Sequence, residues 1–189
     1  IIMNEEIELI LDVAEEQMQE SISRLEMVLS KIRAGKASPQ MLSSVKVDYY
    51  GALTPLSQMA NVNTPDSQTI SIQPFDKSVM GDIEKAIIES NLGLNPMNNG
   101  ELIMINIPAL TEERRRELVK QVKSETENCK VSIRNSRQKA NEEVKKLAKD
   151  GLSEDLARDA ESSVQTLTDK FISNTDKIFT EKEKDVMTI

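Results

Sequence analysis

Three long stretches of the chain carry apolar residues at steps of three and four, the spacing that lays one apolar stripe along an α-helix. They cover residues 5–34, 111–150 and 153–189. The stripes comprise Ile7, Leu11, Ala14, Met18, Ile22, Leu25, Leu29 and Ile32; Leu118, Val122, Cys129, Ile133, Ala140, Val144 and Leu147; and Leu156, Ala160, Val164, Leu167, Phe171 and Ile178. A helix of 30 residues is roughly 45 Å long and needs partner helices to bury its stripe. The pattern therefore predicts an elongated three-helix bundle.

The expected helix ends carry residues typical of such positions. Thr111 is placed to cap the second helix, followed by two glutamates that favour the positive end of the helix dipole. Gly151 is expected to end that helix, and Ser153 to cap the third.

The middle of the chain changes period from 3.6 to two. Gly35, Ser38 and Pro39 break the first helical pattern. Alternating residues then predict strands over residues 45–50, 70–73 and 102–107, the first closed by Gly51 and the second preceded by a turn at residues 65–67. A short amphipathic helix through Val79, Ile83, Ala86 and Ile87 is expected to end near residues 91–93.

The predicted fold class is α+β. A bundle made of residues 1–35 and 109–189 would carry an inserted small β/α/β domain, residues 36–108, joined to it by two short crossings. Two such crossings can act together as a hinge. The candidate hinge residues are Arg33, Gly35, Lys36, Pro108 and Leu110.

The chain has a formal charge of −8, yet its positive residues gather on one element. Residues 111–150 contain twelve Lys or Arg against eight Asp or Glu, while the segments around them are net negative. Arg116, Lys120, Lys123, Lys130, Arg134, Arg137 and Lys145 follow three-or-four spacing. At about 100° per residue they form a row about 100° around the helix from the apolar stripe. We expect this row to be exposed and continuous, which suits a phosphate backbone.

Charge alone leaves other interpretations open. Lys-rich faces on exposed helices are often simply solvated, and Arg114, Arg115 and Arg116 could equally bind acidic helix ends within the bundle. Adjacent Tyr49 and Tyr50 should point to opposite faces of a strand, so that one belongs to the core and the other is either simply exposed or a contact residue.

Few residues offer catalytic or metal chemistry. The chain has no His, and its single cysteine, Cys129, falls on an apolar stripe, where a buried and inert thiol is expected. There is no acid–base constellation and no phosphate-binding glycine loop. We expect no catalytic residue, no metal and no cofactor. With no basic leader and no long apolar run, we expect a cytoplasmic monomer that does not bind membranes.

Five ordered motifs resemble the ribosome recycling factor family over nearly the whole chain. They are Lys31-Ile32-Arg33-Ala34-Gly35-Lys36-Ala37-Ser38-Pro39, Val47-Asp48-Tyr49-Tyr50-Gly51, Leu92-Gly93-Leu94-Asn95-Pro96, Leu110-Thr111-Glu112-Glu113-Arg114-Arg115 and Val131-Ser132-Ile133-Arg134-Asn135-Ser136-Arg137.

The resemblance implies an L-shaped, tRNA-like molecule that is not an enzyme. Such a factor acts with elongation factor G and GTP to split the ribosome after termination. Arg134 and Arg137 match the family's RNA-contacting arginines, and Gln138 replaces a further basic residue found in many relatives. With the charged row, this gives Lys123, Lys130, Arg134, Asn135 and Arg137 as candidate contacts to large-subunit rRNA.

Two rival functions stay open from the residues alone. A helical scaffold would also use three amphipathic stripes, and would self-associate without binding RNA. A hydrolase is the rival from the enzyme class, although it would lack a recognisable acid–base pair.

Overall fold

The computed structural model describes residues 2–32 and 35–188. The chain forms two compact units, and each is described by itself. Unit 1 comprises Ile1–Ala34 with Glu112–Ile189, and unit 2 comprises Gly35–Thr111.

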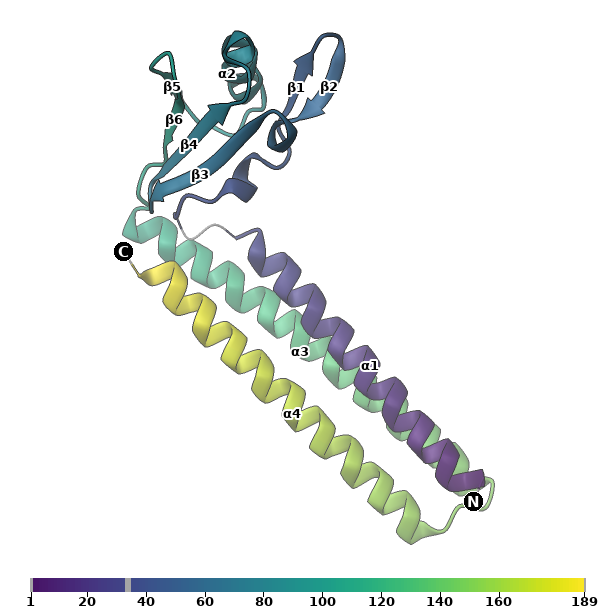
Figure 1. Ribbon diagram of the computed structural model, residues 1–189. Helices are drawn as coiled ribbons and strands as arrows, with labels where there is room; N and C mark the ends of the chain where they lie inside the picture. The colour runs from purple at the N-terminus through teal and green to yellow at the C-terminus, as the bar shows by residue number, and fades with distance from the viewer. Residues whose placement is uncertain (1, 33–34, 189) are drawn as a thin grey trace. The chain divides into compact units, whose positions relative to one another are not determined.

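Unit 1 consists of three long helices that lie side by side (Figure 1). They are α1 (Ile2–Ser30), α3 (Glu112–Lys149) and α4 (Glu154–Met187). Helices α1 and α4 run in the same direction, and α3 runs opposite to both. No helix among the described residues is both long and apolar enough to cross a bilayer.

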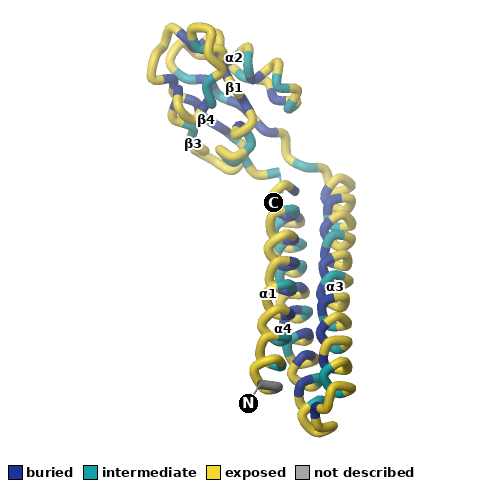
Figure 2. Tube along the Cα trace, turned by 90° about the vertical axis from the view of Figure 1, so that its right-hand side faces the viewer, coloured by how far each residue is buried: buried dark blue, intermediate teal, exposed yellow. Residues whose placement is uncertain are grey.

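The apolar stripes face the inside of unit 1. Figure 2 shows buried residues along the inner side of each helix and exposed residues on the outer side. Met18, Ile22 and Ile133 are at most 1% exposed, and Val164 is completely buried. The predicted stripes of α1 and α3 are therefore confirmed as the faces that pack.

Threonines complete the buried stripe where the apolar pattern has gaps. Thr126, Thr168 and Thr175 are at most 2% exposed. Each hydroxyl donates to the carbonyl four residues earlier, at 2.8 Å, so burial leaves no unpaired donor. The expectation that Leu156 packs in the α4 stripe is wrong, because this residue is 40% exposed in the first turn of the helix.

The link between α3 and α4 forms as its sequence predicts. Gly151 has φ +112°, a conformation that glycine adopts without strain, and Leu152 N–H donates to the Leu147 carbonyl at 3.0 Å. Ser153 caps α4, since its hydroxyl accepts from Leu156 N–H at 3.3 Å.

Unit 2 contains a four-stranded antiparallel sheet in the order β3-β4-β6-β5. The strands are β3 (Ala60–Asp66), β4 (Thr69–Pro74), β5 (Pro96–Asn98) and β6 (Ile103–Asn106), with helix α2 (Met80–Glu89) and three short 3₁₀ helices (Pro39–Leu42, Leu56–Gln58 and Lys77–Val79). Ile70, Ile72, Ile103 and Ile105 are completely buried and form the core with Ile83 and Ile87 of α2.

A separate hairpin precedes this sheet. Strand β1 (Lys46–Tyr49) pairs with β2 (Ala52–Pro55) through a two-residue turn at Tyr50 and Gly51. Both turn residues have positive φ, +51° and +86°, as a tight hairpin turn requires. Tyr50 is therefore a turn residue that is 85% exposed, while Tyr49 packs against the core, and their rings meet edge to face.

Candidate nucleic-acid interface

The row of basic residues lies on α3, and most of it faces solvent. Lys120, Lys123, Arg134 and Lys145 are exposed. No ion pair involves these four side chains within the described part of the chain. From Lys120 to Arg134 the row extends roughly 20 Å along the helix, at about 1.5 Å per residue.

Arg134 and Arg137 are both available to a ligand outside the bundle, but not equally. Arg134 is exposed, and Arg137 is half-buried where the row borders the apolar stripe. Neither guanidinium forms an ion pair with a carboxylate among the described residues. They are therefore candidate donors for phosphate oxygens, which guanidinium groups can bind in a bidentate manner.

Lys130 departs from the prediction that the whole row is exposed. Its side chain is 15% exposed, and its Nζ lies 2.6 Å from Asp176 Oδ1 of α4 and 3.6 Å from Glu127 Oε1. The hydrogen bond to Asp176 raises the pKa of Lys130, with Glu127 adding a smaller effect of the same sign. The exposure prediction fails here because Lys130 lies on the side of α3 next to α4.

Of the three arginines at the start of α3, Arg115 contacts the end of another helix, as the alternative interpretation expects, while Arg114 and Arg116 pair with glutamates of α3 itself. Arg115 is buried, and its Nη1 donates to the Met187 carbonyl at 3.2 Å, so a cation meets the carboxyl end of α4. Arg114 pairs with Glu117 at 2.8 Å, and Arg116 pairs with Glu112. Arg116 thus differs from the unpaired cations further along α3.

Asn135, Gln138 and Val131 border Arg134 on the solvent side of α3. Asn135 is exposed and lies about 100° around the helix from Arg134, on the flank of the row. Gln138 Nε2 donates to Glu142 Oε1 at 3.1 Å. Val131 is an apolar side chain that is 52% exposed, because it lies outside the buried face of α3 and therefore outside the predicted stripe.

The described candidate hinge residues lie at the two ends of unit 2. Gly35 has φ +73°, and a Cβ there would lie 2.8 Å from Leu110 Cγ, so these two residues are in close contact. Ala37 N–H donates to the Ser67 carbonyl and Ile107 N–H to the Gln68 carbonyl, both at 2.7 Å. These two hydrogen bonds thus hold both ends of unit 2 at the turn formed by residues 67–68. Arg33 lies outside the described residues.

The remaining chemical candidates contribute no reactive group. Cys129 is buried, as predicted, and its thiol donates to the Ser21 carbonyl at 3.5 Å. Burial raises the pKa of this thiol, which disfavours the thiolate. The described residues hold no group of three or more His, Cys, Asp or Glu arranged to bind a metal ion.

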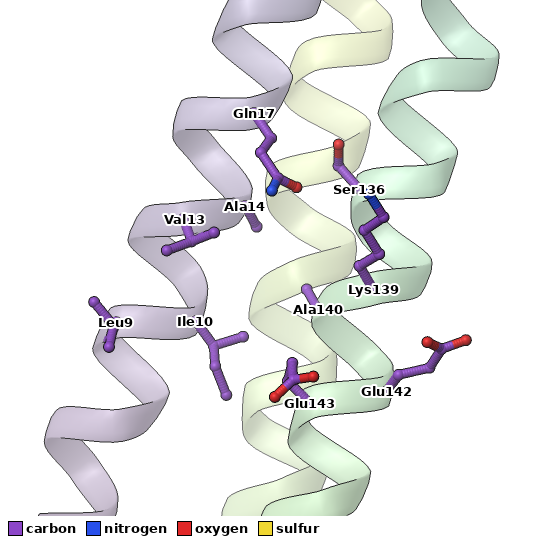
Figure 3. A pocket seen from close by; sticks show the side chains of 10 residues that line it. All are labelled: Leu9, Ile10, Val13, Ala14, Gln17, Ser136, Lys139, Ala140, Glu142 and Glu143. Carbon is purple, nitrogen blue, oxygen red and sulfur yellow. The ribbon is translucent and has the colours of Figure 1, made fainter.

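A groove of 380 Å³ opens between α1 and α3, away from the row. Figure 3 shows Ile10 and Ala14 of α1 pointing towards Ala140 and Glu143 of α3. The small side chains of the two alanines leave this space. The lining is largely apolar and carries Glu142 and Glu143 against one cation, Lys139, which does not suit a phosphate backbone, so the groove is no part of the candidate interface.

Comparison with protein families gives a match over most of the chain. The model described as "Ribosome recycling factor" matches residues 25–187. The ribosome-recycling factor of Flavobacterium psychrophilum is 54% identical over 187 residues, covering 99% of this chain and 100% of the relative. That of Christiangramia forsetii is 55% identical over 185 residues, covering 98% and 100%.

Two solved structures are also similar to the chain. A solution structure of a ribosome recycling factor has a TM-score of 0.74 and 38% identity, and the match covers 97% of this chain and 98% of that one. Models of the T. thermophilus ribosome recycling factor and E. coli elongation factor G bound to the E. coli post-termination complex include a chain that matches with a TM-score of 0.60 and 43% identity, over 96% and 99%. These matches confirm the predicted arrangement of helical terminal segments around a small β-containing domain.

Proposed function

The chain belongs to the ribosome recycling factor family, and we propose that it binds the post-termination ribosome and, with elongation factor G and GTP, promotes subunit dissociation and release from mRNA. Members of this family are non-enzymatic translation factors. A relative 43% identical to this chain has been placed with elongation factor G on the post-termination complex, which supports the assignment. The proposed site of action is the cytoplasm, where ribosomes translate.

The basic face of α3 is the proposed anchor on large-subunit rRNA. Its contact residues would be Lys123, Arg134 and Arg137, with Asn135 on the flank. The observation that carries this assignment is the exposed guanidinium of Arg134, which has no carboxylate partner among the described residues. Lys130 belongs to the same row but is engaged by Asp176, so its proposed part is to hold α4 against α3 rather than to bind RNA.

The second part of the proposal concerns motion at the two crossings. Arg33, Gly35 and Lys36 on one crossing, and Pro108 and Leu110 on the other, would absorb changes in backbone angle while the units stay rigid. The hydrogen bonds from Ala37 and Ile107 to the turn at residues 67–68 support this, because they fix the chain immediately inside both crossings. A push from the GTPase on unit 2 would then strain the contacts between ribosomal subunits.

The anchor is tested by removing two charges from α3. For the double variant Arg134→Ala, Arg137→Ala, we expect ribosome affinity to fall about tenfold or more near 0.1 M salt, since Arg is a strong phosphate ligand. The slope of log affinity against log salt should become shallower by roughly 1.5, corresponding to two lost phosphate contacts.

The matched control removes the same charge from α4. Arg158→Ala, Lys177→Ala replaces two exposed cations that lie off the row, so affinity and slope should stay near the wild-type values. If the α3 double variant also retains wild-type affinity and slope, the proposed anchor is wrong.

A further inference from the structure

Asn99 and Gly100 lie at the tip of the turn between β5 and β6, and both are exposed. No other asparagine in the sequence is followed by a glycine. Gly100 has φ +90°, which glycine adopts without strain. A Cβ built on it would have no atom of the described residues within 4 Å, apart from its chain neighbours. The backbone nitrogen that follows the Asn99 side chain is therefore not shielded by any side chain.

An asparagine next to a glycine can react with its own backbone. The nitrogen of the following residue can attack the side-chain carbonyl carbon, because this attack closes a five-membered ring within one chain. Holding both groups in one molecule makes such a reaction far easier than the same reaction between two molecules. A side chain on the following residue hinders the attack, and glycine has none. The sequence thus favours this reaction at Asn99 over every other asparagine of the chain.

The turn also holds the carbonyl group of the Asn99 side chain in a polarised state. Asn99 Oδ1 accepts from Glu101 N–H at 3.0 Å and from Leu102 N–H at 2.7 Å. Donors at a carbonyl oxygen stabilise the negative charge that develops there when a nucleophile adds to the carbon. The oxygen stays in place during the reaction, so neither hydrogen bond has to break. The leaving nitrogen, Nδ2, has no hydrogen-bond partner within the described part of the chain.

The attacking nitrogen is held only by another exposed side chain. Gly100 N–H donates to Asn98 Oδ1 at 2.8 Å. Asn98 is exposed, so its amide can exchange this hydrogen bond for one with water, and the net cost of such an exchange is small. The nitrogen of Gly100 can therefore be released without opening any pair of the sheet.

Asn135 provides a comparison within the same chain. It is also exposed and is followed by a small residue, Ser136. Both residues lie inside α3, where a backbone N–H is bound to the carbonyl four residues earlier. Attack by the nitrogen of Ser136 would require part of the helix to unwind, which attack by the nitrogen of Gly100 does not.

We propose that Asn99 is a site of spontaneous deamidation in the folded protein. Gly100 N loses its proton to hydroxide and bonds to Asn99 Cγ. The bond from Cγ to Nδ2 then breaks, and the nitrogen leaves as ammonia after taking a proton from water. Water opens the resulting cyclic imide at one of its two carbonyl groups, which gives either an aspartyl or an isoaspartyl residue. Overall, one water is consumed and one ammonia is released.

Both products change the edge of the sheet in unit 2. Each adds a negative charge to the turn. In the isoaspartyl product the backbone runs through the former side chain and is longer by one methylene group. The hydrogen bond from Asn99 N–H to the Leu102 carbonyl, at 3.2 Å, and the pairing of Asn98 with Ile103 depend on the present length of the turn. The reaction therefore gives older molecules a covalent change that young molecules lack.

Ageing of the full folded chain tests the proposal. The protein is kept at physiological temperature and mildly alkaline pH, and samples are separated by isoelectric focusing and digested for mass spectrometry. We expect conversion at Asn99 to be about tenfold or more faster than at Asn135. The rate should rise in proportion to the hydroxide concentration, because the attacking nitrogen must lose its proton. Equal rates at the two asparagines would overturn the proposal.

Gly100→Ala is the matched variant, because it keeps Asn99 and adds one methyl group that has open space around it. We expect it to slow the conversion of Asn99 about tenfold or more, since the methyl group hinders attack. An unchanged rate would show that the nitrogen of residue 100 is not the nucleophile, and would overturn the proposal.

A comparison with the unfolded chain does not depend on how the variant folds. The wild-type chain in urea gives the rate of an Asn-Gly pair without structure. A folded-state rate above the unfolded-state rate, or within about threefold of it, supports deamidation in the folded protein. A lower rate would mean that the turn protects Asn99, and the proposal would be wrong.

Discussion

Lys130 of α3 and Asp176 of α4 form an ion pair across the bundle, with 2.6 Å between Nζ and Oδ1. The lysine side chain is 15% exposed and the aspartate 58%. Pairs that stay in contact with water contribute less than about 1 kcal/mol to folding, since solvent screens the charges. The pair therefore helps to orient α4 on α3 more than it stabilises the fold.

For Lys130→Met, which keeps the aliphatic stem and removes the charge, we expect the free energy of unfolding to fall by about 0.5 kcal/mol near pH 8. Urea titration followed by circular dichroism measures the change. Lys177→Met on the exposed side of α4 is the control and should change stability much less. Equal effects of the two substitutions would mean that the ion pair contributes nothing specific.

The same ion pair predicts that the stability of the fold depends on pH in the alkaline range. The pKa of Lys130 is raised above its ordinary value of 10.5 in the folded state, mainly by the hydrogen bond to Asp176. Its contribution is then fully present below pH 10.5 and is lost as the pH rises through the folded-state pKa. The stability difference between wild type and Lys130→Met should therefore shrink as the pH is raised above 10.5. A difference that is constant over this range would contradict the assignment.

Gln138 allows the proposed RNA-binding row of α3 to be tested by adding a positive charge instead of removing one. It lies about 40° around α3 from Arg134, within the row, and is exposed. Gln138→Arg should add one phosphate contact, raise ribosome affinity severalfold at low salt, and steepen the log–log salt slope by roughly 0.7 to 0.9. Gln121→Arg, about 100° further around the same helix, is the control and should leave the slope unchanged. The two substitutions add the same charge, so equal effects would indicate nonspecific attraction.

The helices could be predicted from the sequence because their stripes are long and their end signals agree. Strand β3 was missed because its outer positions, Asn61 and Asn63, favour loops in isolation, and only pairing with β4 gives them a strand conformation. The hairpin partner β2 was missed for a related reason, since Leu53 is 72% exposed and no alternation marks the segment.

The position of the candidate site on α3 could be predicted from the sequence. Which of its side chains are exposed and which form ion pairs could not. Helical spacing placed Lys130 within the row, while its partner Asp176 lies 46 residues away on α4. Only the packing of α4 on α3 brings these two charges together.

The independence of the two units can be measured with the chain's own probes. Both tyrosines lie in the β1–β2 hairpin and the chain has no Trp, so intrinsic fluorescence reports on unit 2 alone. Cys129 is the single thiol and reports on unit 1. Ile72→Ala, at a completely buried position, should destabilise unit 2 by about 3 kcal/mol and lower the fluorescence midpoint in urea.

The same substitution should leave the labelling rate of Cys129 by a thiol reagent unchanged below the unfolding transition. Ile133→Ala, at a completely buried position of α3, should have the reverse pattern, with faster labelling and an unchanged fluorescence midpoint. If either substitution moved both probes together, the chain would unfold as one cooperative unit.

The contact between Gly35 and Leu110 gives a test of the first crossing. Gly35→Ala carries two costs: a left-handed backbone at φ +73°, about 1 kcal/mol for a residue with a Cβ, and a methyl group 2.8 Å from Leu110 Cγ. We expect a loss of about 2 kcal/mol in the stability of unit 2, measured by the fluorescence midpoint in urea.

Leu110→Ala in the Gly35→Ala background removes the steric cost but not the backbone cost, so it should recover about half of the loss. A coupling energy near 1 kcal/mol in this double-mutant cycle would confirm the contact. A coupling near zero would mean that only the backbone at Gly35 matters, and would leave Leu110 without a part in setting the crossing.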